Sequence, residues 1–190
     1  MKNLVLAVVV LALVVLVASP ASAQSKMSIS VGPDILLPLG SFGDNFSIGF
    51  GGTARGQYDF TPMMSAGLEV GYFTFSVKGD VPAGVDKPSF SAVPVRVFGK
   101  YYFMPEGKAR FYGMFELGFW FSSVSVSYNV PGYGSGSQSA SSTDFNYVPA
   151  VGVEIPAGKM KVDVSIRYDG VATSGGSSSF GGRVGLNFPI

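Results

Sequence analysis

The acidic side chains of this sequence are the first candidates for chemistry. Glu69, Glu116 and Glu154 are three carboxylates, and carboxylates that share a site can serve as general acid and base. That reaction type also needs a cleft and a bound substrate, and no motif near these glutamates indicates either. Each glutamate lies in an alternating stretch of small and apolar residues. We therefore interpret these residues as structural charges and predict no catalytic residue.

Two residue types that are common in active sites and metal sites are absent. The chain has no histidine and no cysteine. Without histidine the chain cannot form a Ser-His-Asp triad, and it lacks the imidazole side chain that is the commonest zinc ligand. Without cysteine there are no disulfides and no thiolate metal sites. The sequence thus predicts a protein that is not an enzyme and that holds no metal and no cofactor.

The stretch Lys159–Gly170 shows most clearly how the charges are positioned. Its odd positions are polar and its even positions, from Met160 to Tyr168, are apolar. Successive side chains of a strand point to opposite faces, so this stretch predicts a strand with one apolar and one charged face. The apolar face could cover the core of a soluble protein, or it could face lipid.

The N-terminus has the pattern of an export signal. Lys2 precedes an apolar run, Leu4–Ala18, and small residues follow up to Ala23. The run is shorter than the about 20 residues that a spanning helix needs. The pattern predicts a secretory signal peptide over residues 1–23, rather than a membrane anchor, and a single domain over 24–190. Without Lys2 the mature chain has 12 basic and 12 acidic residues, which argues against nucleic-acid binding.

The composition favours a membrane protein built from strands. Only 13% of the residues are charged, against about 25% in soluble domains, while 14% are aromatic. Alternating stretches recur eight times, with no helical period between them. The predicted strands are Met27–Leu37, Phe46–Phe60, Met63–Val77, Ser89–Met104, Ala109–Tyr128, Phe145–Ile155, Lys159–Gly170 and Phe180–Ile190. The fifth changes phase at Ser122-Ser123, which predicts a bulge or an exit from the apolar layer.

The connections alternate in length, which predicts an all-β, eight-stranded antiparallel up-and-down barrel. Turns after the second, fourth and sixth strands are tight. The other connections are longer and rich in Gly, Ser, Pro or Asp, and they are Gly40–Asn45, Lys78–Pro88, Asn129–Thr143 and Gly170–Ser179. In outer-membrane barrels the short turns and both termini are periplasmic. The longer connections are then expected to be extracellular.

Aromatic residues distinguish lipid from a soluble core on the apolar face. They collect at both ends of the predicted strands and leave Val, Leu, Ile, Ala and Met between them, as expected at two membrane interfaces. The short-turn group comprises Tyr58, Phe60, Tyr101, Phe103, Phe111 and Phe188, and the long-loop group comprises Phe46, Tyr72, Phe119, Phe121, Phe145, Tyr147, Tyr168 and Phe180. A soluble, lipocalin-like binding barrel is the alternative, but its polar outer face would need more charge.

The barrel interpretation turns the charged face of each strand into the lumen. An eight-stranded barrel is just wide enough for side chains to fill its interior. Buried charges are costly unless they are paired, so we expect salt bridges across the strands. The predicted lumen charge network consists of Arg55, Glu69, Arg96, Lys100, Glu116, Glu154, Lys161, Asp163, Arg167 and Arg183.

Several stretches resemble one known family. The loop Pro38–Asp44, the glycine-rich second strand and the terminal Val184–Phe188 are similar to the small outer-membrane β-barrel family, which includes OmpX-like proteins and the OmpA transmembrane domain. The resemblance implies a bacterial outer-membrane location, contact with membrane lipid and insertion by the barrel-assembly machinery. The chain departs from the family pattern at its end, where Pro189-Ile190 follows Phe188.

Three functions remain open at this point. The first is a structural or surface-interaction barrel with a plugged lumen, whose loops 78–88, 129–143 and 170–179 present a surface to an extracellular ligand. The second is a narrow passive channel for small solutes or ions. The third is an outer-membrane lipid-modifying enzyme or protease, which resembles histidine-dependent family enzymes, and the lack of histidine argues against it.

Overall fold

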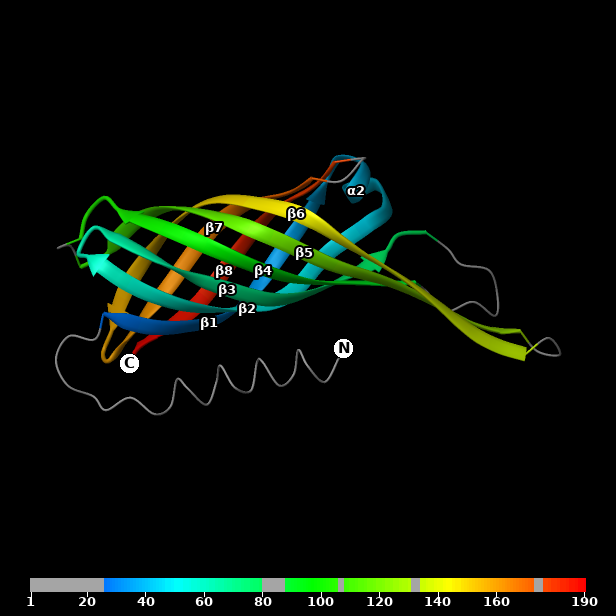
Figure 1. Ribbon diagram of the computed structural model, residues 1–190, viewed down its shortest axis with the longest axis horizontal. Helices are drawn as coiled ribbons and strands as arrows, with labels where there is room; N and C mark the ends of the chain where they lie inside the picture. The colour runs from blue at the N-terminus through cyan, green and yellow to red at the C-terminus, as the bar shows by residue number, and fades with distance from the viewer. Residues whose placement is uncertain (1–25, 80–87, 106–107, 131–133, 173–175) are drawn as a thin grey trace.

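The computed structural model describes residues 26–79, 88–105, 108–130, 134–172 and 176–190. These residues form a closed antiparallel barrel in which each strand pairs with its sequence neighbours and the last strand pairs with the first (Figure 1). The predicted fold class is confirmed. The elements are β1 (Met27–Leu39), α2 (Gly40–Asn45), β2 (Phe46–Thr61), β3 (Met64–Val77), β4 (Ser89–Tyr102), β5 (Arg110–Val130), β6 (Gly134–Ala157), β7 (Met160–Ala172) and β8 (Ser177–Pro189).

The two ends of the barrel differ. The short turns between β2 and β3 and between β6 and β7 lie at the end that also holds the C-terminus (Figure 1). The helix α2 and the β5–β6 hairpin lie at the other end. We call this second end the α2 end. The predicted signal peptide, residues 1–23, lies outside the described residues.

Side chains alternate across the wall as the sequence pattern predicts. Outward positions are apolar and exposed, as at Leu68 with 63% of its surface accessible and Val97 with 56%. Inward positions carry the charges, and Glu69 and Arg96 are each only 1% accessible. In water, a barrel with apolar residues outside and charges inside would expose a large apolar surface. In a membrane the same surface contacts lipid, which stabilises the barrel. No helix among the described residues is long and apolar enough to cross a membrane.

The predicted loop 129–143 is wrong for most of its length. β5 continues to Val130 and β6 begins at Gly134, and the two strands remain paired out to Val130 and Gly134. Figure 1 shows this hairpin reaching beyond the rest of the barrel. Residues 131–133 lie outside the described residues. The serine-rich sequence lacks apolar alternation, but its backbone groups pair with each other all the same.

Other boundaries also differ from the predictions. The connection at 40–45 is a short helix rather than a loop. Much of 170–179 is strand, because β7 ends at Ala172 and β8 begins at Ser177. Most of 78–88 lies outside the described residues. The register of β5 with both neighbours continues unshifted across Ser122 and Ser123, so there is no bulge at the phase change.

Phe46 was predicted on the outward aromatic face, and this prediction is wrong. A register shift between β2 and β3 lies between Phe46 and Gly49. It turns the Phe46 ring towards Phe42 of α2, at 4.8 Å between ring centroids, and towards Phe90, at 5.0 Å. Phe42 and Phe46 are therefore part of a plug of aromatic rings at the α2 end.

Candidate functional site

The inward charges begin with a row that crosses three neighbouring strands. Arg55 on β2 is the register partner of Glu69 on β3, and Glu69 is the register partner of Arg96 on β4. Opposite charges thus alternate along the row. Arg55 Nε lies 2.5 Å from Glu69 Oε2, and Arg96 Nη1 lies 2.8 Å from Glu69 Oε1. Charged pairs with this hydrogen-bonded geometry are the strong ones.

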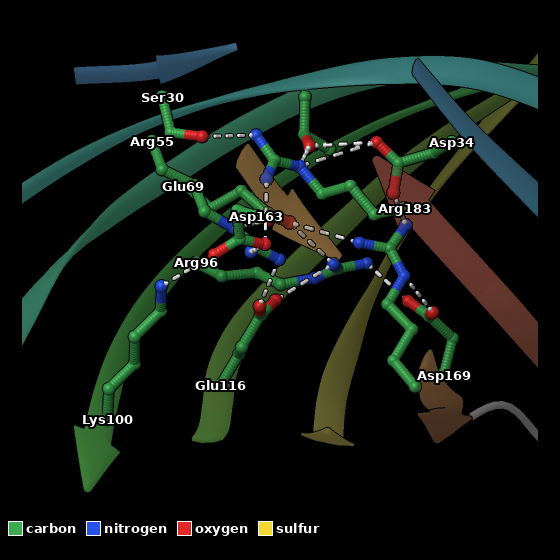
Figure 2. A network of polar contacts seen from close by, with 12 residues as sticks. Ser30, Asp34, Arg55, Glu69, Arg96, Lys100, Glu116, Asp163, Asp169 and Arg183 are labelled. Atoms are coloured by element: carbon green, nitrogen blue, oxygen red, sulfur yellow. Dashed lines mark hydrogen bonds and ion pairs between the residues drawn. The ribbon is translucent and has the colours of Figure 1, made fainter. Parts of the chain in front are cut away.

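Arg96 connects the row to the far wall. Its Nη1 is 3.1 Å from Glu116 Oε2, and its Nη2 is 2.6 Å from Asp169 Oδ1. Its Nε also donates a hydrogen bond to the side-chain oxygen of Asn146. Figure 2 shows Arg96, Glu116 and Asp169 pointing towards one another from different strands. One guanidinium therefore forms ion pairs with three carboxylates. The planar fork of five N–H donors allows this, whereas a lysine ammonium offers three donors at a single point.

A layer towards the α2 end is built around Asp34. Arg167 Nη2 lies 3.0 Å from Asp34 Oδ1, and Thr53 donates a 2.8 Å hydrogen bond to Asp34 Oδ2. Arg183 donates to Thr53 and Ser30, at 2.7 and 2.8 Å. Because β1 and β8 are neighbours only in the closed barrel, these contacts bind the two ends of the sheet together.

A layer towards the short-turn end is built around Lys100. Its Nζ lies 3.0 Å from Glu154 Oε1 and 3.1 Å from Asp163 Oδ2. The hydroxyls of Tyr102 and Tyr112 donate to the same two carboxylates, at 2.8 Å and 3.0 Å. Lys100 also lies 4.3 Å from the centre of the Tyr112 ring. The two tyrosines thus fill space in the lumen and also donate hydrogen bonds to the carboxylates.

The structure brings nine of the ten predicted lumen residues into fully buried positions and leaves one at the edge. The buried nine are Arg55, Glu69, Arg96, Lys100, Glu116, Glu154, Asp163, Arg167 and Arg183. The side chain of Lys161 is 27% accessible and its Nζ lies 3.6 Å from Glu154 Oε2. A lysine has a long flexible stem, so its ammonium can reach water at the rim.

Sequence reasoning missed several residues that belong to the same cluster. Asp34 and Asp169 are buried, with side chains 0% and 2% accessible, and both pair with Arg167. The alternation along their strands places both residues on the polar face, so the sequence already indicates that they point into the lumen. Alternation also places Tyr102, Tyr112 and Asn146 on the polar face of their strands, but these side chains carry no charge that would mark them as members of an ion-paired cluster.

The chemistry available in the lumen is that of paired charges. The side chains of Arg55, Glu69, Arg96 and Glu116 are at most 1% accessible. Each of these carboxylates faces two or more cations, so neither has the vacant, substrate-facing position of a general base. Among the described residues there is also no group of three His, Cys, Asp or Glu side chains that could hold a metal ion.

The comparison with family models identifies the class of protein. Residues 8–188 match the outer membrane protein beta-barrel domain. The chain belongs to this family, and its barrel is accordingly that of a bacterial outer-membrane protein embedded in lipid. The resemblance stated from the sequence is confirmed. A comparison with curated proteins gives no match.

Solved structures of small outer-membrane barrels share the fold. Neisserial surface protein A aligns with a TM-score of 0.59 and 15% identity, covering 89% of this chain and 100% of that chain. Ail of Yersinia pestis aligns at 0.54 and 16%, covering 87% and 100%. OprG of Pseudomonas aeruginosa aligns at 0.54 and 11%, covering 90% and 99%. At these identities the similarity extends to the fold alone.

Proposed function

We propose that this protein is a structural and surface-interaction barrel of the outer membrane whose lumen is closed by the ion-paired charges. The observation that carries the proposal is the burial of both signs of charge at the same level of the barrel. A continuous water path would leave guanidinium and carboxylate atoms accessible, yet the side chains of Arg96, Glu69 and Glu116 are 0% accessible. The lumen is then a structural filling, and neither conduction nor catalysis is its role.

The alternative is a narrow passive channel. It gains some support from buried polar atoms that lack a hydrogen-bond partner, such as Nδ2 and Oδ1 of Asn187 and the hydroxyl of Ser165. Such atoms are commonly satisfied by water. Ser165 and Asn187 lie on β7 and β8, away from the Arg55–Glu69–Arg96 row. Within the row, Arg55 Nη1 also lacks a hydrogen bond, but it lies 3.9 Å from Asp163 Oδ1 and is enclosed by charged side chains, so any water on β7 and β8 would meet the row as a barrier.

Solute uptake by liposomes separates the two functions. Vesicles that contain the refolded protein should swell in an isotonic solution of a small uncharged solute no faster than vesicles without protein. Swelling that increases with the amount of protein would establish the channel instead. Vesicles with a conducting porin provide the positive control.

We further propose that the short-turn end is periplasmic and the α2 end extracellular, after removal of residues 1–23 and insertion by the barrel-assembly machinery. The absence of cysteine makes this easy to test. A single cysteine in place of Ser139, in the hairpin, should react with a membrane-impermeant maleimide on intact cells. A cysteine in place of Gly158, in the β6–β7 turn, should react only after the outer membrane is opened. The opposite result would reverse the orientation.

Surface interaction is the remaining part of the proposal. One Ail structure holds the heparin analogue sucrose octasulfate. In the described part of this chain, the pocket at the α2 end is lined by two aspartates and no basic residue, so a polyanion does not fit there. A partner of this pocket is therefore expected to be neutral or positively charged.

A further inference from the structure

The α2 end holds a pocket of about 440 Å³ next to the outermost charged layer. Small-molecule sites in proteins fall in this range of volume. The lining comes from α2 and from strands β2, β4, β5, β6, β7 and β8, so residues from most of the chain meet there. The pocket has two kinds of wall, one of aromatic rings and one of serine hydroxyls and carboxylates.

The aromatic wall is held in place by ring contacts behind it. Phe42, Phe46 and Phe90 line the pocket and pack against one another, with centroids 4.8 to 5.7 Å apart. Trp120 lines it as well and is stacked on Phe73, with centroids 5.7 Å apart and planes inclined by 17°. These rings do not need to rearrange to accept a ligand, which lowers the entropic cost of binding.

The charge of the pocket is negative and unevenly compensated. Asp169 lies at its inner side and is neutralised by Arg96 at 2.6 Å and Arg167 at 2.9 Å. Asp144 also lines the pocket, but it makes no ion pair with any described residue. Within the part of the chain that the structure describes, the one hydrogen bond of its carboxylate is donated by the Ser142 hydroxyl at 2.7 Å. Asp144 is also the direct register partner of Trp120, so an uncompensated carboxylate stands beside an indole ring.

We propose that this pocket binds a small organic cation, with its ammonium group at Asp144 and its carbon body against Phe42, Phe46 and Phe90. An ammonium group is attracted both by a carboxylate and by the faces of aromatic rings. The guanidinium groups behind Asp169 repel a cation from the inner side and so fix the orientation. A neutral sugar would leave Asp144 uncompensated, and an anion would be repelled by it. The proposal does not depend on whether the lumen conducts.

The chain carries its own reporter for this site. Trp120 is the only tryptophan of the sequence, so intrinsic fluorescence reports on the pocket directly. The probe is choline, and its matched control is 3,3-dimethylbutanol, which has the same shape without the charge. The protein is held in tetraoxyethylene octyl ether micelles, which contribute neither ammonium groups nor sugars, at constant ionic strength. Choline should shift the emission saturably and bind at least about tenfold more tightly than the alcohol.

Two aspartate variants locate the charge. Asp144→Asn should weaken choline binding about tenfold and leave the binding of the alcohol unchanged. Asp44→Asn is the matched control, because Asp44 lies in α2 at the same end but does not line the pocket, and it should bind choline as the natural protein does. A heat-dependent shift in gel mobility checks that each variant is folded.

Equilibrium dialysis with labelled choline keeps the test independent of fluorescence. Saturable uptake that Asp144→Asn weakens would support the proposal. Absence of saturable uptake would overturn it, and so would equal affinity for choline and the alcohol. Equal affinity of the natural protein and Asp144→Asn would also overturn it. Saturable binding of glucose in the absence of choline binding would assign the pocket to neutral sugars and would reject the cation.

Discussion

The strands β5 and β6 follow one rule in the middle of the barrel and the opposite rule in the hairpin that extends beyond it. Within the barrel, β5 and β6 contribute Glu116 and Glu154 to a lumen in which the carboxylates are matched by cations. Beyond it, the same strands carry serine and glycine with hardly any charge. A spanning strand needs about 9–11 residues, whereas β6 has 24. The difference shows that polar groups in the membrane-embedded part need partners within the protein, whereas those in the water-exposed hairpin do not.

The cause is the availability of water to satisfy polar groups. A hydroxyl on the hairpin can bond to solvent, so its partner need not be built into the protein. A guanidinium in the lumen cannot bond to solvent in this way, and leaving it unpaired would cost several kcal/mol. Stability should therefore be concentrated in the lumen and nearly independent of the hairpin.

Among single substitutions, the largest effect is expected for Arg96→Leu. The change removes one cation from Glu69, Glu116 and Asp169 together, and breaking a buried ion pair typically costs about 3–5 kcal/mol. The free energy of unfolding, measured with urea in lipid vesicles, should fall by that amount. Lys161→Leu is the matched control: its partly exposed ammonium makes one ion pair at 3.6 Å, so the loss should stay within about 1 kcal/mol. Equal losses in both variants would contradict the account.

The next effect concerns the outer face of the wall. Val97 points outward near the middle of β4, where Leu68 is its register partner. An arginine on the lipid face near the bilayer midplane costs about 2–4 kcal/mol, so Val97→Arg should destabilise the barrel by this amount. Val126→Arg places the same side chain on the hairpin and should change the free energy of unfolding by no more than about 0.5 kcal/mol. A tolerated arginine at 97 would mean that this face does not contact lipid.

The smallest effect is expected for shortening the hairpin. If the chain beyond the Ser125–Ser139 pair is replaced by a two-residue turn, the free energy of unfolding should change by about 0.5 kcal/mol or less. Deleting the single residue Phe115 from the barrel wall should instead prevent folding, because it shifts the following inward and outward side chains by one position. If removal of the hairpin unfolded the barrel, stability would depend on the hairpin as well as on the lumen, and the account would be contradicted.

The same contrast explains what the sequence could predict. Alternation within the membrane is enforced on both faces, and it identified the strands, their inward charges and nine buried network members such as Arg96. The hairpin is under no such constraint, so Ser135–Thr143 has no periodic signal, and its strand structure was missed. Phe46 was assigned to the wrong face because a register shift changes the phase of β2 without any mark in the sequence. The pocket could not be predicted, because its lining is assembled from seven elements.

The central claim is that paired charges close the lumen, and single-channel recording tests it most directly. The natural protein, reconstituted in a planar bilayer, should show no steady conductance, because the side chains of Arg96, Glu69 and Glu116 leave no accessible surface at their level of the barrel. Refolded protein that retains its heat-dependent gel shift provides the check that the barrel is intact. A steady, reproducible unitary conductance in that sample would contradict the account and establish a channel.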